Sequence, residues 1–260
     1  MRFHEMTSAR LASIDRVQTV AVVPIAAVEQ HGPHMPTGTD YFLCTAVVEA
    51  LETRRPHNVL LTPTLWLGAS SHHLRYGATL DAGLDNYVAT LCDVGQSLLD
   101  DGFRRVLFVN GHGGNVDPLR VALRQLQPAY PDALLAGGSY WSVADDCIRD
   151  VLEGDHKFVG HACEFETSMM LHVRPELVAR ELLADAGQLV TDNIDGVFVS
   201  RDMRQRTRQG YTGRPDLATA EKGKLLLDGV VDRLATLLEK LLAEPLAADY
   251  EDFVGDEDGS

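Results

Sequence analysis

Three short segments of the sequence concentrate histidine and carboxylate side chains. The first begins at Glu29 and His31, in the run Glu-Gln-His-Gly-Pro-His, and ends at Asp40. Side chains two apart on an extended backbone point the same way, so Glu29 and His31 can reach one point, and the Gly-Pro turn lets Asp40 return toward it. Taken alone, Asp40 also suits the N-cap of the helix expected after it, and His34 suits a turn or a supporting position.

The second segment is the run Asn-Gly-His-Gly-Gly-Asn at residues 110–115, which contains His112. It follows a predicted buried strand and precedes a predicted helix, and in open α/β sheets that edge faces the ligand. Its three glycines allow close backbone approach, although a glycine turn before a helix could also hold a phosphate. The lone histidine and the lack of P-loop spacing and lysine favour the first interpretation.

The third segment runs from His161 to Ser168 and contains Glu164 and Glu166. One histidine and two carboxylates within six residues are more than a buried helix start requires. A purely structural interpretation stays open, because acidic residues at a helix N-terminus interact favourably with the helix dipole. Cys163, beside them, is a weaker candidate nucleophile.

Together the three segments offer imidazole and carboxylate ligands without a cysteine cluster. Mixed nitrogen and oxygen donors suit Zn²⁺, Mn²⁺ or Fe²⁺ rather than a structural all-thiolate zinc site. The set can hold two divalent ions with Asp40 bridging them. Two adjacent cations lower the pKa of a shared water and polarise a carbonyl, so the pattern predicts a metal-dependent hydrolytic site.

Alternating strand-like and helix-like segments would position these residues. Short apolar runs predict strands at residues 17–28, 58–65, 105–110 and 133–139. Apolar residues at helical spacing predict helices at residues 40–54, 84–101, 116–127, 165–171 and 217–243. This alternation predicts an α/β fold with a mostly parallel sheet covered by helices on both faces.

Length and composition fit one large globular domain. The chain has 260 residues, of which 45% are apolar and 23% charged. Its formal net charge is −15 and no basic face emerges, which argues against a nucleic-acid or anionic-membrane partner. Residues 244–260 carry seven acids and no Lys or Arg. We therefore expect a catalytic domain over residues 1–246 and a disordered acidic tail over residues 247–260.

The spacing of the cysteines and the composition of the N-terminal residues indicate in which cellular compartment the protein is expected. The cysteines are scattered, without a C-x-x-C pair: Cys44, Cys92, Cys147 and Cys163. Two disulfides are conceivable, but the N-terminal residues contain no apolar export signal and no run of about 18 apolar residues occurs. The sequence therefore predicts four reduced thiols, a cytoplasmic location and no membrane span.

An arginine-rich segment at residues 200–215 stands out from the acidic chain. It holds five arginines and one acid, Asp202. Two interpretations are open: a solvated loop, or a loop that faces another subunit or an anion.

The three segments together resemble the creatininase (creatinine amidohydrolase) family. The family motif E-Q-H-G-P-H-[LM]-P-x-x-T-D is matched at residues 29–40, and N-G-H-G-G-N at residues 110–115. The motif H-A-G-E-x-E-T-S is matched at residues 161–168, except that Cys163 takes the glycine place. A fourth signature, G-x-x-G-x-P-x-x-A-x-x-E-K-G, is matched at residues 210–223, so the resemblance spans about residues 20–223 in order.

The resemblance implies a single three-layer αβα sandwich, often assembled as a hexamer, with two divalent metal ions per subunit. Carried over to this chain, Glu29, Asp40 and His112 would hold one ion. His31, Asp40 and Glu164 would hold the other. Zinc is the expected metal, with manganese or iron as alternatives.

Three further residues acquire catalytic roles from the resemblance. His161 matches a histidine placed beside the substrate, and we expect it to shuttle a proton. Glu166 would orient a ligand from outside the metal shell. His73 matches the histidine of the segment H-x-x-F-P-G-T, although this chain reads His-Leu-Arg-Tyr-Gly-Ala-Thr and lacks the Pro-Gly pair.

Two departures separate the chain from enzymes that act on creatinine. Those enzymes take the last metal ligand from a glutamate two residues after the histidine that matches His112, where this chain has Gly114. They also have a tryptophan near the position of His161, which this chain lacks. The chain is therefore similar to the H-A-G-E branch, whose members act on formamidopyrimidine-type amides, a modified peptide or a keto-inositol ring.

The expected function is hydrolysis of a small amide or lactam, a non-peptide C–N bond, by metal-bound hydroxide. One alternative is C–C hydrolysis of a keto-inositol carbocycle on the same pair of metals. Another is a non-catalytic protein that retains its metal site.

Overall fold

Four parallel strands form one sheet at the centre of the protein. The computed structural model describes residues 1–154, 157–187, 189, 194 and 196–254. The strands lie in the order β2-β1-β3-β4: β1 (Val20–Ile25), β2 (Val59–Leu61), β3 (Arg105–Asn110) and β4 (Leu134–Ser139). In the register, Val20 pairs with Val59 and Arg105, and Arg105 pairs with Leu134. The parallel sheet predicted from the sequence is confirmed.

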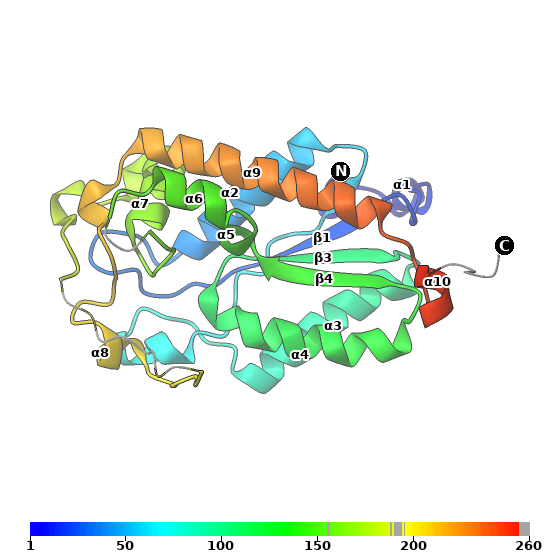
Figure 1. Cartoon of the computed structure of the whole chain (residues 1–260), viewed down its shortest axis with the longest axis horizontal. Coiled ribbons are helices and arrows are strands. Elements are labelled where there is room, and N and C mark those ends of the chain that lie inside the picture. Colours follow the sequence, from blue (N-terminus) through cyan, green and yellow to red (C-terminus); the bar gives the residue numbers. More distant parts are fainter. Residues whose placement is uncertain (155–156, 188, 190–193, 195, 255–260) are drawn as a thin grey trace.

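Helices cover both faces of this sheet (Figure 1). The α-helices of the described residues are α1 (Ser8–Ala12), α2 (Thr39–Arg54), α3 (Leu84–Asp100), α4 (Val116–Leu126), α5 (Tyr140–Val143), α6 (Asp145–Val151), α7 (Glu164–Val173), α8 (Met203–Arg206), α9 (Ala220–Ala243) and α10 (Tyr250–Val254). Short 3-10 helices include η2 (Ser71–Tyr76) and η3 (Gly113–Asn115). Helices α3 and α4 cover one face, and α2, α5, α6, α7 and α9 cover the other.

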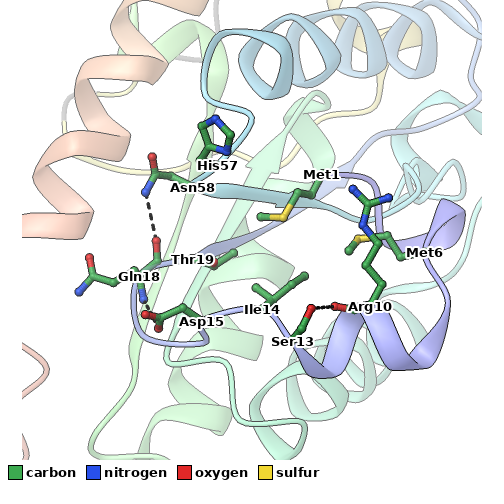
Figure 2. A pocket seen from close by; sticks show the side chains of 10 residues that line it. All are labelled: Met1, Met6, Arg10, Ser13, Ile14, Asp15, Gln18, Thr19, His57 and Asn58. Atoms are coloured by element: carbon green, nitrogen blue, oxygen red, sulfur yellow. Dashed lines mark hydrogen bonds between the residues drawn. The ribbon is translucent and has the colours of Figure 1, made fainter.

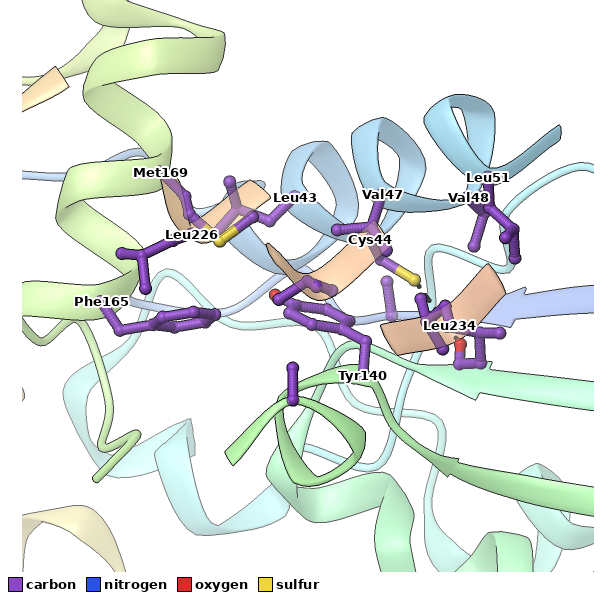
Figure 3. Close-up of a cluster of buried hydrophobic side chains, with 14 of the residues drawn as sticks. Leu43, Cys44, Val47, Val48, Leu51, Tyr140, Phe165, Met169, Leu226 and Leu234 are labelled. Carbon is purple, nitrogen blue, oxygen red and sulfur yellow. Dashed lines mark hydrogen bonds between the residues drawn. The ribbon is translucent and has the colours of Figure 1, made fainter. Parts of the chain in front are cut away.

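Successive residues of β1 face opposite helical layers, as the two-residue repeat of a strand requires. Val20 and Val22 pack in one hydrophobic core with side chains of α2, α7 and α9. Ala21 and Val23 pack in a second core with side chains of α3 and α4. Figure 3 shows part of the first core, to which α2 contributes Leu43. The fold is therefore the three-layer αβα sandwich that the resemblance implied.

A surface hollow of about 250 Å³ lies at the amino ends of β1 and β2 (Figure 2). Thr19 and Asn58, which line it, immediately precede these two strands. Glu29 and His31 follow the carboxyl end of β1 instead, and His112 follows the carboxyl end of β3. The hollow and the candidate site therefore lie at opposite edges of the sheet.

The C-terminal residues and the cysteines complete the description. Tyr250–Val254 forms the short exposed helix α10 inside the segment expected to be disordered, and residues 255–260 lie outside the described part. All four cysteines are free thiols. None of the described helices is both long and apolar enough to cross a lipid bilayer.

Candidate metal centre

Side chains from two loops and one helix meet at the carboxyl edge of the sheet. Glu29 and His31 follow β1, His112 follows β3, and Asp40 lies in the first turn of α2. His31 Nε2 lies 3.1 Å from Asp40 Oδ1. His112 Nδ1 lies 3.2 Å from Asp40 Oδ2 and 3.3 Å from Glu29 Oε1. All four residues are buried, and the Asp40 carboxylate stands between the two imidazoles.

The loop between β1 and α2 folds back on itself, which brings Asp40 to this point. Gly32 takes a φ of +62°, and the Glu29 N–H donates to the Thr37 carbonyl at 2.9 Å. The N-cap of α2 is Gly38. The alternative in which Asp40 serves only as the N-cap is therefore wrong, because Asp40 lies inside the helix with its carboxylate turned to the histidines.

Three imidazoles are held in the same way. Each donates its outer N–H to a main-chain carbonyl: His31 Nδ1 to Glu29 at 3.0 Å, His112 Nε2 to Ala69 at 3.0 Å, and His161 Nε2 to Gln30 at 2.7 Å. The other nitrogen of each ring is then an unprotonated lone pair in the neutral form, directed at the carboxylates. Histidines that bind metal ions in proteins typically show this arrangement.

Three carboxylate oxygens of the cluster are buried without hydrogen bonds. Both oxygens of Glu29 and Oδ2 of Asp40 have no hydrogen-bond partner within the described part of the chain. A buried carboxylate without partners is strongly disfavoured unless a cation lies beside it. The donor set of carboxylate oxygens and imidazole nitrogens therefore fits divalent metal ions.

Glu164 does not join this cluster, contrary to the ligand set carried over from the resemblance. Its carboxylate accepts hydrogen bonds from Lys222 Nζ at 2.7 Å and from the backbone N–H groups of Glu153 and Gly154. Glu166, two residues later on α7, lies with His31 and Asp40 instead, with potential ligand atoms within 4.8 Å of one another. The first turn of α7 thus directs Glu164 to the Lys222 ion pair and Glu166 to the cluster.

His73 and His161 border the cluster on the side of Glu29. His73 Nε2 lies 3.3 Å from Glu29 Oε1, and His161 Nδ1 lies 3.5 Å from the same atom. The Gln30 amide N–H group contacts His73 Nδ1 at 2.9 Å and the Gly210 carbonyl at 2.9 Å. Gln30 Oε1 accepts from the Gly32 N–H, which orients the amide so that His73 carries its proton on Nε2.

The electrostatics divide the histidines into two kinds. Burial disfavours the charged form of His31, but Asp40 outweighs burial and raises its pKa to about 9. Burial lowers the pKa of His73 to about 3 and holds the pKa of His161 well below its usual value. Burial also raises the pKa of Glu166 to about 7. Positive charge is therefore favoured between the carboxylates, while His73 and His161 are neutral.

The Asn-Gly-His-Gly-Gly-Asn turn is braced by its two asparagines. Asn110 Oδ1 accepts from the His112 N–H at 3.0 Å, and Asn110 Nδ2 donates to the His112 carbonyl at 2.7 Å. Asn115 Oδ1 accepts from the Ala69 N–H, and its Nδ2 donates to the Ala26 carbonyl. These bonds hold the backbone of His112 and both asparagine side chains in place, so the turn presents His112 to the cluster.

Gly114 leaves no room for a side chain. A Cβ there would lie 2.1 Å from the Ala69 carbonyl oxygen and 2.5 Å from His112 Nε2. We expect Gly114→Ala to lower the free energy of unfolding by about 3 kcal/mol, because the backbone carbonyl cannot yield as a flexible side chain would. Urea denaturation measures this value. Gly113→Ala is the matched control, since a Cβ at Gly113 meets nothing within 4 Å, and equal losses in the two variants would contradict the prediction.

The arginine-rich segment packs over the helix that carries His73. Asp202 accepts from Arg75 Nη1 at 2.7 Å, and Tyr76 donates its hydroxyl to the Thr207 carbonyl at 2.6 Å. The Arg204 guanidinium lies 4.6 Å above the Tyr76 ring. Part of this segment is therefore a cover for η2 rather than a solvated loop.

Cys163 is not placed to act as a nucleophile. It is buried, and burial together with the nearby Glu166 raises the pKa of its thiol to about 12. The thiolate that nucleophilic attack requires is therefore scarce at neutral pH.

Two residues of the site, Gln30 and His72, were not predicted from the sequence. Gln30 lies inside the first motif, where its alternation with Glu29 and His31 indicates that it points the opposite way. His72 precedes His73 and lies with Glu29 and His112, with potential ligand atoms within 4.8 Å of one another. The two adjacent histidines, His72 and His73, are the only sequence feature that could have indicated His72.

Comparison with known proteins gives the family. The family model for creatininase, described as creatinine amidohydrolase, matches residues 4–238. The chain belongs to the creatininase family. The family assignment made from the sequence motifs is confirmed, and the chain is a creatininase-family hydrolase.

Relatives in the family carry different activities. A mycofactocin precursor peptide peptidase of Mycobacterium ulcerans is 32% identical over 81% of this chain and 81% of its own length. A 3-dehydro-scyllo-inosose hydrolase of Thermotoga maritima is 25% identical over 92% of this chain and 83% of its own. The similarity therefore includes family members other than creatininase, as the H-A-G-E motif indicated.

Solved creatininases share the fold. The structure of a creatinine amidohydrolase (creatininase) has a TM-score of 0.77 and 26% identity, covering 94% of this chain and 98% of that chain. A creatininase variant described as the Zn–Zn type has a TM-score of 0.78 and 26% identity, with the same coverage. The family is metal-dependent, and the His/Glu/Asp cluster of this chain could hold metal ions.

Proposed function

We propose that this enzyme hydrolyses the C–N bond of a small amide or lactam with the help of two divalent metal ions. The observation that carries the proposal is the arrangement of three imidazoles. Each is bonded through its outer nitrogen to a main-chain carbonyl and directs its inner nitrogen at buried carboxylates, of which both Glu29 oxygens and Asp40 Oδ2 have no hydrogen-bond partner in the described residues. Such a preorganised set of imidazole and carboxylate donors is typical of residues that bind metal ions.

Two groups of ligands share Asp40. Glu29, Asp40 and His112 would hold one ion, and His31, Asp40 and Glu166 the other. Glu166 takes the place first expected for Glu164, whose carboxylate is occupied by Lys222. Zinc is the proposed metal, because imidazoles contribute to both groups, and manganese or iron are alternatives.

When bound, the ions would lower the pKa of a water molecule and polarise the amide carbonyl. His161 is placed to handle the proton. Its Nε2–H is held by the Gln30 carbonyl, and its neutral Nδ1 faces the cluster. This nitrogen can accept the proton of the attacking water and deliver it to the leaving nitrogen. His73 would hold the Glu29 carboxylate in position through its Nε2, which lies 3.3 Å from Glu29 Oε1.

A short peptide is the second candidate substrate. The relative from Mycobacterium ulcerans, which acts on a precursor peptide, favours this possibility at 32% identity. Both candidates require attack on an amide carbonyl, so the same residues would serve. A short peptide differs from a small amide or lactam in the size of the groups attached to the scissile C–N bond.

A substrate panel tests the proposal. The enzyme, loaded with zinc or with manganese, is given formamides, lactams, short peptides and inososes, and amine release is followed by fluorescamine alongside ring opening by mass spectrometry. Amine release from a small amide or lactam supports the proposal. Release only from peptides favours the second candidate, and opening of an inosose without amine release would show C–C hydrolysis instead. Inactivity of the metal-loaded enzyme on the whole panel would favour a non-catalytic protein.

Replacing His161 with alanine tests its role. We expect turnover to fall about 100-fold while both metal ions remain bound, because His161 moves a proton and does not hold metal. Metal content is measured by elemental analysis after gel filtration, and turnover on the best substrate of the panel. Unchanged turnover would exclude the proton-transfer role, and loss of metal would make His161 a ligand.

We also propose a cytoplasmic homo-oligomer, a hexamer by family resemblance, acting on small molecules rather than nucleic acid or membranes. The four free thiols and the net charge of −15 support this setting. Analytical ultracentrifugation of the full chain measures the oligomeric state.

A further inference from the structure

The half-buried His72 lies next to Glu29 and His112 of the candidate metal centre. A ring nitrogen of His72, a carboxylate oxygen of Glu29 and a ring nitrogen of His112 lie within 4.8 Å of one another. The His72 and His112 rings are stacked, with centroids 5.7 Å apart and planes 20° apart. Within the described residues, no hydrogen bond or ion pair engages either nitrogen of His72.

The chain around His72 is firmly held. In η2 the His73 N–H donates to the Ser70 carbonyl at 2.9 Å, and the Ser70 N–H donates to Asp81 at 2.8 Å. Residues next to helix α8 hold η2 through hydrogen bonds to Arg75 and Tyr76. Because these bonds fix the backbone of η2, the His72 ring would lose little conformational entropy when it binds a metal ion.

The structure also explains why a histidine fits here. The His72 ring lies so close to Gly114 that a Cβ at Gly114 would be 2.8 Å from His72 Cε1. A side chain at position 114 and the His72 ring therefore compete for one space. Because residue 114 is glycine, the His72 imidazole can occupy this space.

We infer that His72 is an additional ligand of the ion held by Glu29 and His112. The ion in this group would then have two imidazoles beside its carboxylates. Because imidazole favours zinc over manganese more than carboxylate does, His72 would bias this position toward zinc. This inference rests on the proposed function, since it assumes that metal ions occupy the cluster.

Metal affinity of His72→Ala tests the inference. The experiment uses metal-free full chain titrated with Zn²⁺ or with Mn²⁺ in competition with a chromophoric chelator. We expect zinc affinity at one of the two positions to fall about 10-fold or more, and manganese affinity to fall less. The absorption spectrum of the Co²⁺-loaded protein should also change. His172→Ala, in which an exposed histidine of α7 is removed, is the matched control and should behave as wild type.

The outcomes separate the two proposals. If the wild-type chain takes up no metal, both the proposed function and the role of His72 fail. If the wild-type chain binds two ions and His72→Ala binds them equally well, only the role of His72 fails. Equal loss of zinc and manganese affinity would make the His72 ring a packing element and would also overturn the inference. If His72→Ala does not fold, His72→Gln is measured with the same outcomes, because it offers no imidazole nitrogen.

Discussion

Replacing Glu166 with glutamine is expected to remove one of the two metal ions and to lower turnover about 100-fold, whereas replacing Glu164 is expected to leave both ions in place. Glu166 lies with His31 and Asp40, and an amide oxygen is a much poorer metal ligand than a carboxylate. Glu164 is occupied by Lys222 Nζ at 2.7 Å. Elemental analysis of both purified variants measures the metal content.

Glu164→Gln serves as the matched control, because it makes the same chemical change two residues away on the same helix. It should lower the free energy of unfolding by about 1 kcal/mol, since the largely buried Lys222 ammonium loses the closer and more buried of its two carboxylate partners and keeps Glu153. Thermal or urea denaturation measures that loss. If Glu164→Gln loses metal and Glu166→Gln keeps it, the ligand set carried over from the family motif is right and the exchange proposed here is wrong.

Replacing Asp40 with asparagine is expected to have the largest effect on the site. Its two oxygens face different histidines, His31 at 3.1 Å and His112 at 3.2 Å, so both proposed ions share this carboxylate. We expect bound metal to fall from about two ions per chain toward none, and turnover to fall to background. Metal content after gel filtration and turnover on the panel substrate are the measurements.

Asp117→Asn is a suitable control, because Asp117 also lies in the first turn of a helix but is exposed on α4. It should keep the metal content of the wild type. Retention of both ions in Asp40→Asn would exclude the shared carboxylate. Loss of only one ion would place Asp40 in a single ligand group.

Much of the fold could be predicted because burial imposes a simple periodicity. The apolar run at 105–110 predicted β3 with its observed bounds, since every residue of that strand is buried. The helices at 40–54 and 84–101 were predicted to within one residue at each end. The convergence of Glu29, His31 and His112 followed from the rule that parallel strands end at the same sheet edge.

The side-chain directions in the third segment could not be predicted in the same way. Glu164 and Glu166 are two residues apart at the start of α7, so their side chains point about 200° apart around the helix axis. Which of them meets the cluster depends on how α7 is rotated against α2 and α9. That rotation is set by tertiary packing, in which Phe165 and Met169 fill the core, and no local pattern reports it.

His72 and Gln30 were missed for related reasons. His72 sits on a 3-10 helix whose short, irregular turn gives no readable periodicity, and its neighbour His73 carried the family motif. Gln30 has a neutral side chain, and its importance lies in contacts to His73 and to Gly210, which is 180 residues away in the chain. Such long-range partners leave no trace in the spacing of one motif.

The main-chain carbonyls behind His31, His112 and His161 constrain how the metal centre can vary among relatives of this chain. Every amino acid has a carbonyl, so substitution at Glu29, Gln30 or Ala69 does not by itself delete the acceptor that holds each ring. Most substitutions at these three positions therefore leave the acceptor that orients each ring in place. Divergence in metal selectivity would then arise from exchanging carboxylates or adding new donors at the rim.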